Sequence, residues 1–405
     1  MKILFITGML PFPLDNGRKL RSFHLIRKLS EGNGLTLFIT DEKNPDEKNI
    51  GELKKYCKDV KIAPCAELST PRLILRLFLS IFRKEPFSLL KRYSNRIRQQ
   101  LHSLIDETRP DVIICDRLTE TLYLLDKGIK AIKIYSTHNV EYQIVRRFSE
   151  STTDILKKLA SYIEWKRMEA YERRVWENFD FSIAVSENNK DIISKFIPKE
   201  RVFVVLNGID TGYFQPVKNT KTPFSIIYTG QMGWFPNEDA MLYFTSEMYP
   251  LIKKEVPDLK FFIVGSNTSA KVKKLAEGDE SIKVTGRVED IREYIDRAAV
   301  YIVPLRIGSG TRIKILEALA MEKPVISTTV GCEGLELTNG KEIVISDKPA
   351  EFANRVVSLL KDEKAGQRLG EAGRKVIKEK YDWEVVFNQL DKLIDKLGSS
   401  VGSAG

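Results

Sequence analysis

The sequence is poor in cysteine, with four among 405 residues, at Cys57, Cys65, Cys115 and Cys332. These positions form neither a disulfide framework nor the close pairs that bind zinc. They are typical of a protein in a reducing compartment, and we expect it to be cytoplasmic. The sequence also lacks clusters of Asp or His with ligand spacing, so we predict no metal site.

Long apolar runs are absent as well. No stretch approaches the roughly 20 apolar residues that a membrane-spanning helix needs. The apolar start of the chain ends within a few residues, before Pro11, Pro13 and Asp15, and it predicts a buried strand rather than a secretion signal. We therefore expect a soluble or peripheral protein.

Positive charge is in excess, with a formal net charge of +10. This charge favours nucleic acid, an anionic membrane face or phosphorylated substrates as partners. No groove-reading motif is present, so we predict no nucleic-acid partner. Much of the excess lies in residues 72–98, where bulky apolar residues alternate with cations. That segment is either a surface that meets anionic lipid on the inner membrane face, or a helix packed on the first domain.

Two α/β domains are predicted from the pattern of the chain. Short apolar runs alternate with helical patterns in both halves, which is typical of doubly wound parallel sheets. The strands predicted are 2–7, 35–40, 111–115, 130–136, 181–185 and 202–206, then 225–229, 260–264, 282–285, 300–303, 325–328 and 343–346. Turn formers with low periodicity mark a linker between the halves.

One segment, 308–321 with the sequence GSGTRIKILEALAM, carries most of the functional signal. Gly308 and Gly310 let the backbone approach a ligand before a helix whose first N–H groups favour an anion. Arg312 and Lys314 add charges suited to phosphate. The alternative is that both cations are solvated, with Lys314 paired to Glu317.

Glu317 lies on a helix that is apolar nearly all round. A carboxylate there is costly unless it is hydrogen-bonded, and a ribose diol offers two donors. The alternative is an ion pair with Lys314 or another basic residue.

This segment resembles the donor-binding helix of family-4 retaining glycosyltransferases of the GT-B fold. The resemblance extends over nearly the whole chain, including the linker that begins Asn207-Gly-Ile-Asp. It implies two Rossmann-like domains that face an interdomain cleft, at 1–207 and 224–380. The linker is then 208–223, a helix at 381–398 crosses back to the first domain, and a disordered tail occupies 399–405.

The resemblance also implies the chemistry. The co-substrate is a nucleotide-sugar, with no other cofactor, and the acceptor is a saccharide or a lipid-linked molecule in surface polysaccharide or glycolipid assembly. Sugar transfer is a front-face substitution with retention, in which the leaving phosphate helps to deprotonate the acceptor. The residues predicted to take part in catalysis are His138, Arg312 and Lys314. Those predicted to bind the donor are Asn16, Gly17, Gly230, Gln231, Gly286, Arg287, Ser309, Gly310, Thr311 and Glu317.

Several of these positions depart from the family pattern. Ser309 stands where the family usually has an acid that touches the donor sugar, so the sugar is left open. The loop at Gly230 lacks the usual Arg and Lys, which assigns phosphate binding mainly to Arg312 and Lys314, with backbone N–H groups near Gly230 and Gly233 assisting. Asn16 replaces one glycine of a loop that closes over the diphosphate, and a plain turn is the alternative there. His138 either borders the donor sugar or caps the next helix.

Two other functions remain open from the sequence. A nucleotide-sugar epimerase of the same architecture would need acid and base carboxylates in its cleft. A non-catalytic nucleotide-sugar-binding partner of a membrane synthase would fit the missing acid at Ser309.

Overall fold

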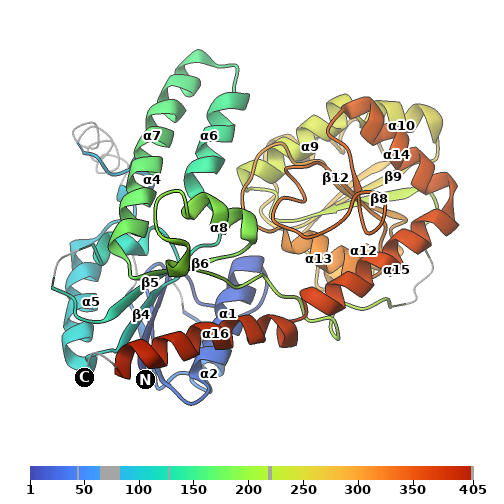
Figure 1. The fold of residues 1–405 in the computed structure, drawn as a ribbon. Helices are drawn as coiled ribbons and strands as arrows, with labels where there is room; N and C mark the ends of the chain where they lie inside the picture. Colours follow the sequence, from blue (N-terminus) through green and yellow to red (C-terminus); the bar gives the residue numbers. More distant parts are fainter. Residues whose placement is uncertain (43–44, 64–82, 126–127, 218–220, 403–405) are drawn as a thin grey trace. The chain divides into compact units, whose positions relative to one another are not determined.

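The computed structural model describes residues 1–42, 45–63, 83–125, 128–217 and 221–402 (Figure 1). The chain divides into two compact units. Unit 1 comprises Met1–Leu206 with Phe387–Gly405, and unit 2 comprises Asn207–Val386.

Unit 1 is built on a parallel sheet of seven strands in the order β3-β2-β1-β4-β5-β6-β7. The described strands are β1 (Lys2–Thr7), β2 (Gly34–Ile39), β3 (Asp59–Ile62), β4 (Val112–Cys115), β5 (Ile132–Ser136), β6 (Phe181–Ala184) and β7 (Val202–Val204). The central strands are continuous buried apolar runs, as expected for a sheet covered on both faces. The sequence did not predict β3, because this edge strand is short, partly exposed and polar at alternate positions.

Helices connect these strands. They are α1 (Gly17–Ser30), α2 (Glu47–Leu53), α4 (Phe87–Leu90), α5 (Asn95–Thr108), α6 (Glu141–Ser151), α7 (Ile155–Asn178) and α8 (Glu187–Ile193), with short 3-10 turns at Glu120–Tyr123 and Lys199–Arg201. Helices α6 and α7 pack together as a hairpin that extends away from the sheet of unit 1 (Figure 1).

The last helix, α16 (Trp383–Gly402), starts in unit 2 and continues into unit 1. The prediction of a disordered tail is wrong for residues 399–402, which extend this helix. Ser399 and Ser400 donate their hydroxyls to the carbonyls of Asp395 and Lys396, so small polar residues are accommodated in the last turn. Residues 403–405 lie outside the described part.

Unit 2 contains a second parallel sheet, of six strands in the order β10-β9-β8-β11-β12-β13. The described strands are β8 (Ser225–Thr229), β9 (Lys260–Val264), β10 (Ile282–Gly286), β11 (Val300–Val303), β12 (Val325–Ser327) and β13 (Val344–Ile345). The described helices are α9 (Phe235–Glu247), α10 (Tyr249–Glu255), α11 (Ala270–Lys274), α12 (Ile291–Arg297), α13 (Ile313–Ala320), α14 (Pro349–Lys361) and α15 (Glu363–Lys380).

The described residues of the predicted linker belong to unit 2. Ile209 forms a β-bridge with Asp382, and the side chain of Phe214 is buried. The hydroxyl of Thr211 donates to the Asp382 carboxylate. The segment is therefore fixed to the unit by backbone pairing and packing.

In each sheet the order of the strands reverses at one position, so that consecutive strands are added first to one side of the sheet and then to the other. This position lies between β1 and β4 in unit 1 and between β8 and β11 in unit 2. Ligands of open parallel sheets bind at the carboxyl ends of the strands beside such a point. These two places are therefore where functional side chains are expected.

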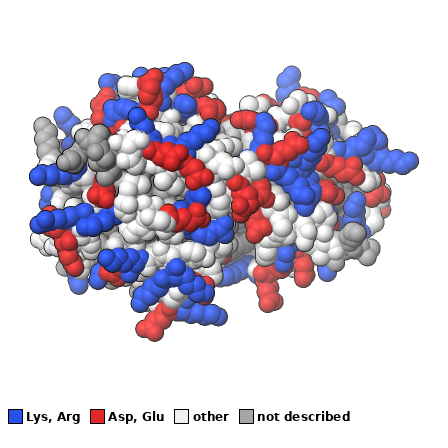
Figure 2. Space-filling model, turned by 60° about the horizontal axis from the view of Figure 1, so that its bottom comes forward, with Lys and Arg blue, Asp and Glu red and all other residues white. Residues whose placement is uncertain are grey.

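The surface carries charges of both signs, and on the face in Figure 2 basic and acidic side chains are intermixed. Within the described residues, no helix is long and apolar enough to cross a membrane. Residues 72–82 of the basic apolar segment lie outside the described part. In its described remainder Leu89 and Leu90 are buried in unit 1, so these two side chains are not available to lipid.

Candidate active site

Three glycines bring the strand ends of unit 2 together. Gly230 follows β8, Gly265 follows β9, and Gly286 ends β10. The amide of Gly230 donates to the Val264 carbonyl, and that of Gly265 donates to the Gly286 carbonyl, both at 3.0 Å. A Cβ atom on Gly265 would lie 1.6 Å from the Gly230 carbonyl oxygen. Only glycine fits there. The backbones of Gly230, Gly265 and Gly286 thus form one continuous surface at the carboxyl ends of the strands, which we call the glycine floor.

A glycine-rich turn leads from β11, the neighbour of β8, into α13. Gly308 and Gly310 have φ of 156° and 73°, which favours glycine. Arg312 precedes the helix and is buried. Its guanidinium donates to the carbonyls of Ser309 and Gly310, the latter at 2.7 Å. Arg312 thus holds the turn in place, and the phosphate contact predicted for it stays a prediction.

Lys314 extends from the first turn of α13 towards β8. Its ammonium donates to Asn237 Oδ1 at 3.1 Å and lies 3.9 Å from the centre of the Tyr228 ring. The Tyr228 hydroxyl donates to the same Asn237 oxygen at 2.6 Å. The ammonium also lies close to the backbone of Gly230, since a Cβ atom on that glycine would be 2.8 Å from Lys314 Nζ. These contacts hold the cation directly above the glycine floor.

Burial lowers the pKa of Lys314 well below its usual value, and the nearby Arg312 charge lowers it further. The Glu317 carboxylate acts in the opposite direction to the repulsion by Arg312 and raises that pKa. An anion at this place would relieve the repulsion and raise that pKa. The site is therefore suited to a phosphate group.

Glu317 lies one turn further along α13 and is half-buried. Within the described residues its carboxylate makes no hydrogen bond and no ion pair within 4.0 Å, but the charge of Lys314 lowers its pKa, so the two side chains attract each other at longer range. Burial raises the pKa of Glu317 to about 7. A half-buried carboxylate can accept hydrogen bonds from a diol, and the ribose contact of Glu317 stays a prediction.

The other predicted donor residues of unit 2 lie around the same edge but differ in exposure. Ser309 is buried and Thr311 half-buried in the turn before α13. Gln231 is exposed, and its carbonyl accepts a hydrogen bond from Asn237 Nδ2 at 2.9 Å. Arg287 is exposed beyond the edge strand β10. No contact in the described structure assigns a ligand role to Arg287.

Unit 1 has its own polar cluster, at the ends of β1, β4 and β5. His138 Nε2 lies 3.1 Å from Asp116 Oδ1, within ion-pair distance. The other carboxylate oxygen accepts hydrogen bonds from Ser22 and from Thr7, the latter at 3.4 Å. Asp116 has no exposed surface, and His138 is nearly buried. The amides of Glu141 and Tyr142 at the start of α6 are accepted by Glu172, while Nε2 of His138 faces Asp116, and the contact of His138 with the donor sugar stays a prediction.

Sequence reasoning missed Asp116. The signal was present, because an acidic residue directly follows the buried strand β4 at the winding reversal of the sheet. Its partner strand β5 delivers His138 to the same edge. Two parallel neighbours that end in Asp and His place these side chains next to each other.

Asn16 and Gly17 lie at the start of α1. The Asn16 carboxamide oxygen accepts from the amides of Arg18 and Lys19, each at 3.1 Å. Asn16 is therefore the N-cap of this helix. Helix capping therefore accounts for an asparagine at position 16. The predicted contact of Asn16 with a donor stays a prediction.

No group of three or more His, Cys, Asp or Glu side chains within the described ranges is arranged to hold a metal ion.

Both halves of the sequence match known glycosyltransferase profiles. Residues 223–362 match the glycosyl transferases group 1, and residues 62–213 match glycosyltransferase family 4. The chain belongs to the family-4-like group 1 glycosyltransferases. Its two Rossmann-like parallel-sheet units are those of the GT-B fold, as the sequence predicts.

Individual relatives extend over most of the chain. An uncharacterized 44.6 kDa protein of the cps region of Klebsiella pneumoniae is 22% identical over 96% of this chain and 99% of its own length. The capsular polysaccharide biosynthesis glycosyltransferase CapM of Staphylococcus aureus is 22% identical over 65% of this chain and 70% of its own. The crystal structure of Anabaena HepE in complex with UDP and glucose superposes with a TM-score of 0.70 at 12% identity, covering 98% of this chain and 99% of that one.

Proposed function

We propose that this glycosyltransferase moves a sugar, with retention of configuration, from a nucleotide-sugar to a saccharide or lipid-linked acceptor during surface polysaccharide or glycolipid assembly. The assignment of the pathway is supported by the capsular relative, and the nucleotide-sugar by the UDP and glucose bound in a protein of the same fold. We further propose that the protein acts in the cytoplasm.

The observation that carries the proposal is the arrangement on α13. Lys314 lies above a floor of glycine backbone, and Glu317 presents an unsatisfied carboxylate one turn away. A nucleoside diphosphate offers both phosphate oxygens for a cation and a ribose diol for a carboxylate. Lys314 would bind the phosphates, and Glu317 would accept the two hydroxyls.

In the reaction, charge grows on the leaving diphosphate as the bond to the sugar breaks. The positive charges of Lys314 and Arg312 would stabilise that charge more strongly in the transition state than in the bound donor. Because these side chains supply the positive charge, we propose that transfer requires no metal ion. In unit 1, Asp116 would orient His138, which would contact the sugar.

The test begins with nucleotide binding. Thermal unfolding is measured with UDP-, GDP-, ADP- and dTDP-sugars, for the wild type and for Glu317→Ala. A donor at one hundred times its dissociation constant stabilises the folded protein by about 2.7 kcal/mol. We expect one donor to shift the wild-type transition, and the shift to be lost in Glu317→Ala.

Glu247→Ala is the matched control, because Glu247 is an exposed carboxylate on α9. It should keep the full shift. The stabilising donor is then incubated with an acceptor panel, with and without EDTA, and the anomeric configuration of the product is determined by NMR. An equal thermal shift in Glu317→Ala, an inverted product or an epimerised donor sugar would contradict the proposal.

A further inference from the structure

The outer end of the α6–α7 hairpin carries large apolar side chains that are open to solvent. Ile155 and Leu156 are 81% and 79% exposed, and Leu159 is 59% exposed. Tyr162 and Ile163 follow at 48% and 45%. The spacing of these five residues is that of one face of a helix, so they form a continuous apolar stripe over the first two to three turns of α7. We call them the hairpin stripe.

The rest of α7 shows what a covered face looks like in this protein. Met168, Tyr171, Val175 and Trp176 continue along the helix and are buried in the core of unit 1. The hairpin stripe therefore occupies the N-terminal turns of α7, before the helix reaches the core of its unit. Figure 1 shows the hairpin of α6 and α7 extending away from the sheet of unit 1. An exposed apolar patch of this kind on a soluble protein marks an interaction site.

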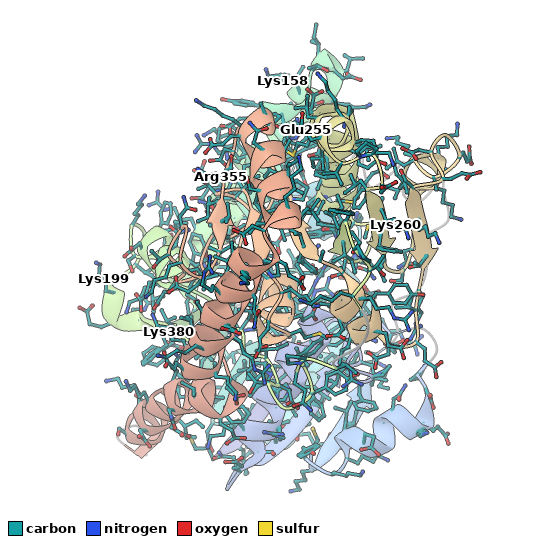
Figure 3. All side chains as sticks on the ribbon, turned by 90° about the vertical axis from the view of Figure 1, so that its right-hand side faces the viewer. Lys158, Lys199, Glu255, Lys260, Arg355 and Lys380 are labelled. Atoms are coloured by element: carbon teal, nitrogen blue, oxygen red, sulfur yellow. The ribbon has the colours of Figure 1, made fainter. Side chains whose placement is uncertain are left out.

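Basic residues frame the stripe. Between Arg146 and Arg167 the sequence has six Lys or Arg and three Asp or Glu. Lys157 and Lys158 are exposed within the stripe's own turns, and Lys158 marks that end of the hairpin in Figure 3. One of the three acids, Glu164, accepts the amides of Phe87 and Ser88 and so faces the unit. The other two acids pair with cations of the same segment, Glu150 with Arg146 at 2.8 Å and Asp154 with Lys157 at 3.4 Å. Lys158 and the remaining basic residues leave this end with a net positive charge.

An aromatic pair closes the stripe on the side of the unit. The rings of Tyr162 and Trp165 meet edge to face at 5.2 Å. Two cations lie over the Trp165 ring, Lys166 at 4.2 Å and Arg146 at 5.3 Å. Exposed apolar side chains next to Tyr, Trp and cations are the combination found where a protein meets the interface of a lipid bilayer.

We propose that the hairpin stripe inserts into the surface of an anionic lipid bilayer. Ile155, Leu156 and Leu159 enter the boundary between headgroups and acyl chains, while Lys157 and Lys158 meet anionic headgroups. The positive excess at this end favours lipid over a second copy of the chain, because two such ends would repel each other. The inference concerns the location of the enzyme and does not depend on its donor or acceptor.

Vesicle flotation of the full chain tests the proposal. Vesicles of phosphatidylcholine with about a third phosphatidylglycerol are compared with pure phosphatidylcholine, at low and at high salt. We expect binding to the anionic vesicles that weakens at high salt. Substituting Ile155, Leu156 and Leu159 together by Ser should reduce it at least about tenfold. Lys157→Gln with Lys158→Gln should reduce it roughly 30-fold, since each cation near the surface contributes about 1 kcal/mol.

The matched control is Val217→Ser, Phe224→Ser and Leu251→Ser, three partly exposed apolar residues of unit 2. It should bind vesicles as the wild type does. Binding that is equal in the wild type and in the Ile155, Leu156 and Leu159 variant would overturn the proposal, as would no binding by the wild type. Size-exclusion chromatography identifies a second copy as the partner if the wild type is dimeric and that variant is monomeric. A lower unfolding temperature of that variant without vesicle binding shows instead that the stripe is covered within the molecule.

Discussion

At the scale of single residues, Asp116 is fully buried, and its two carboxyl oxygens face three side chains. Burial of a carboxylate is costly unless such contacts compensate it. Ser22 and Thr7 satisfy one oxygen, and His138 faces the other. The carboxylate therefore fixes the position of the imidazole within its unit.

His138→Ala and Asp116→Asn should both lower turnover, by roughly 100-fold, because a displaced catalytic group loses most of its effect. The affinity for the nucleotide should remain unchanged, since Lys314 and Glu317 lie in unit 2. Steady-state kinetics and nucleotide titration of each variant separate the two effects. Asp191→Asn, at an exposed position of α8, is the control and should behave as the wild type. Loss of nucleotide affinity together with turnover would mean that Asp116 and His138 act on the stability of the whole chain.

The sequence alone predicted some of these residues better than others. The placement of Lys314 and Glu317 on one helix followed from local periodicity, and their roles in donor binding stay predictions. The contact of Lys314 with Asn237 joins residues 77 positions apart, and the pattern around Arg312 did not reveal that its guanidinium binds its own loop. Charge indicates that a residue can bind an anion, but packing decides which partner it takes.

At the scale of secondary structure elements, α7 supplies the N-terminal caps of two other helices. The carboxylate of Glu164 accepts the amides of Phe87 and Ser88 at the start of α4. Glu172 accepts the amides of Glu141 and Tyr142 at the start of α6, at 3.1 and 3.0 Å. The residues at the cap positions of α4 and α6 are Pro86 and Val140, which make no capping bond of their own.

The most reliable predictions at this scale were the buried strands, because a run of apolar residues between turn formers is a local signal. The caps of α4 and α6 were not predictable, since their carboxylates lie 30 to 77 positions away in sequence. The strand β3 was missed for another reason, because its four residues alternate polar and apolar over too short a run to indicate a strand without the neighbouring strand β2.

Glu172 gives the structure a pH dependence. Burial raises its pKa from 4.5 to about 8, against the two amide hydrogen bonds that favour the carboxylate. The folded state therefore holds a proton that the unfolded chain releases above pH 4.5. Its contribution to the free energy of unfolding is complete below pH 4.5 and is lost as the pH rises to about 8, by at most about 1.4 kcal/mol per pH unit.

Glu172→Gln keeps the shape of the protonated acid and cannot ionise. We expect the variant to gain stability relative to the wild type as the pH rises from 5 to 8, in urea unfolding monitored by circular dichroism. Glu169→Gln, at a partly exposed position one turn earlier on the helix, is the control and should show no such trend. A constant difference between Glu172→Gln and the wild type from pH 5 to 8 would show that the carboxylate is ionised throughout.

At the scale of the whole molecule, the chain leaves unit 1 after Leu206 and returns to it at Phe387. The return is carried by α16, whose side chains contact two distant parts of unit 1. The Arg27 guanidinium lies 5.0 Å from the centre of the Phe387 ring, and Lys28 pairs with Asp391 at 3.0 Å. Gln389 accepts the amide of Leu206 at 2.9 Å, which ties the last residue of the first segment to the helix.

These contacts make the C-terminal helix part of the folding unit that begins at the N-terminus. Leu390, Leu393 and Leu397 are fully buried on one face of α16, at the spacing of helical turns. The sequence resemblance predicted a helix that returns to the first domain, but only the packing shows how much of unit 1 depends on it.

Leu393→Ala tests this dependence, because it removes a fully buried side chain from the middle of the returning helix. Such a cavity costs about 2–5 kcal/mol, which is a large part of the stability of an ordinary domain. We expect unit 1 to unfold at lower temperature and lower urea concentration, while nucleotide-sugar still stabilises unit 2 to the wild-type extent. Hydrogen exchange measured by mass spectrometry reports the two units separately, and protection should fall in β1, β4 and α1 but not in β8 or α13.

Leu251→Ala, at a partly exposed position of α10, should leave both patterns unchanged. If protection in unit 1 is retained in Leu393→Ala, α16 is an appendage of that unit and not one of its folding elements.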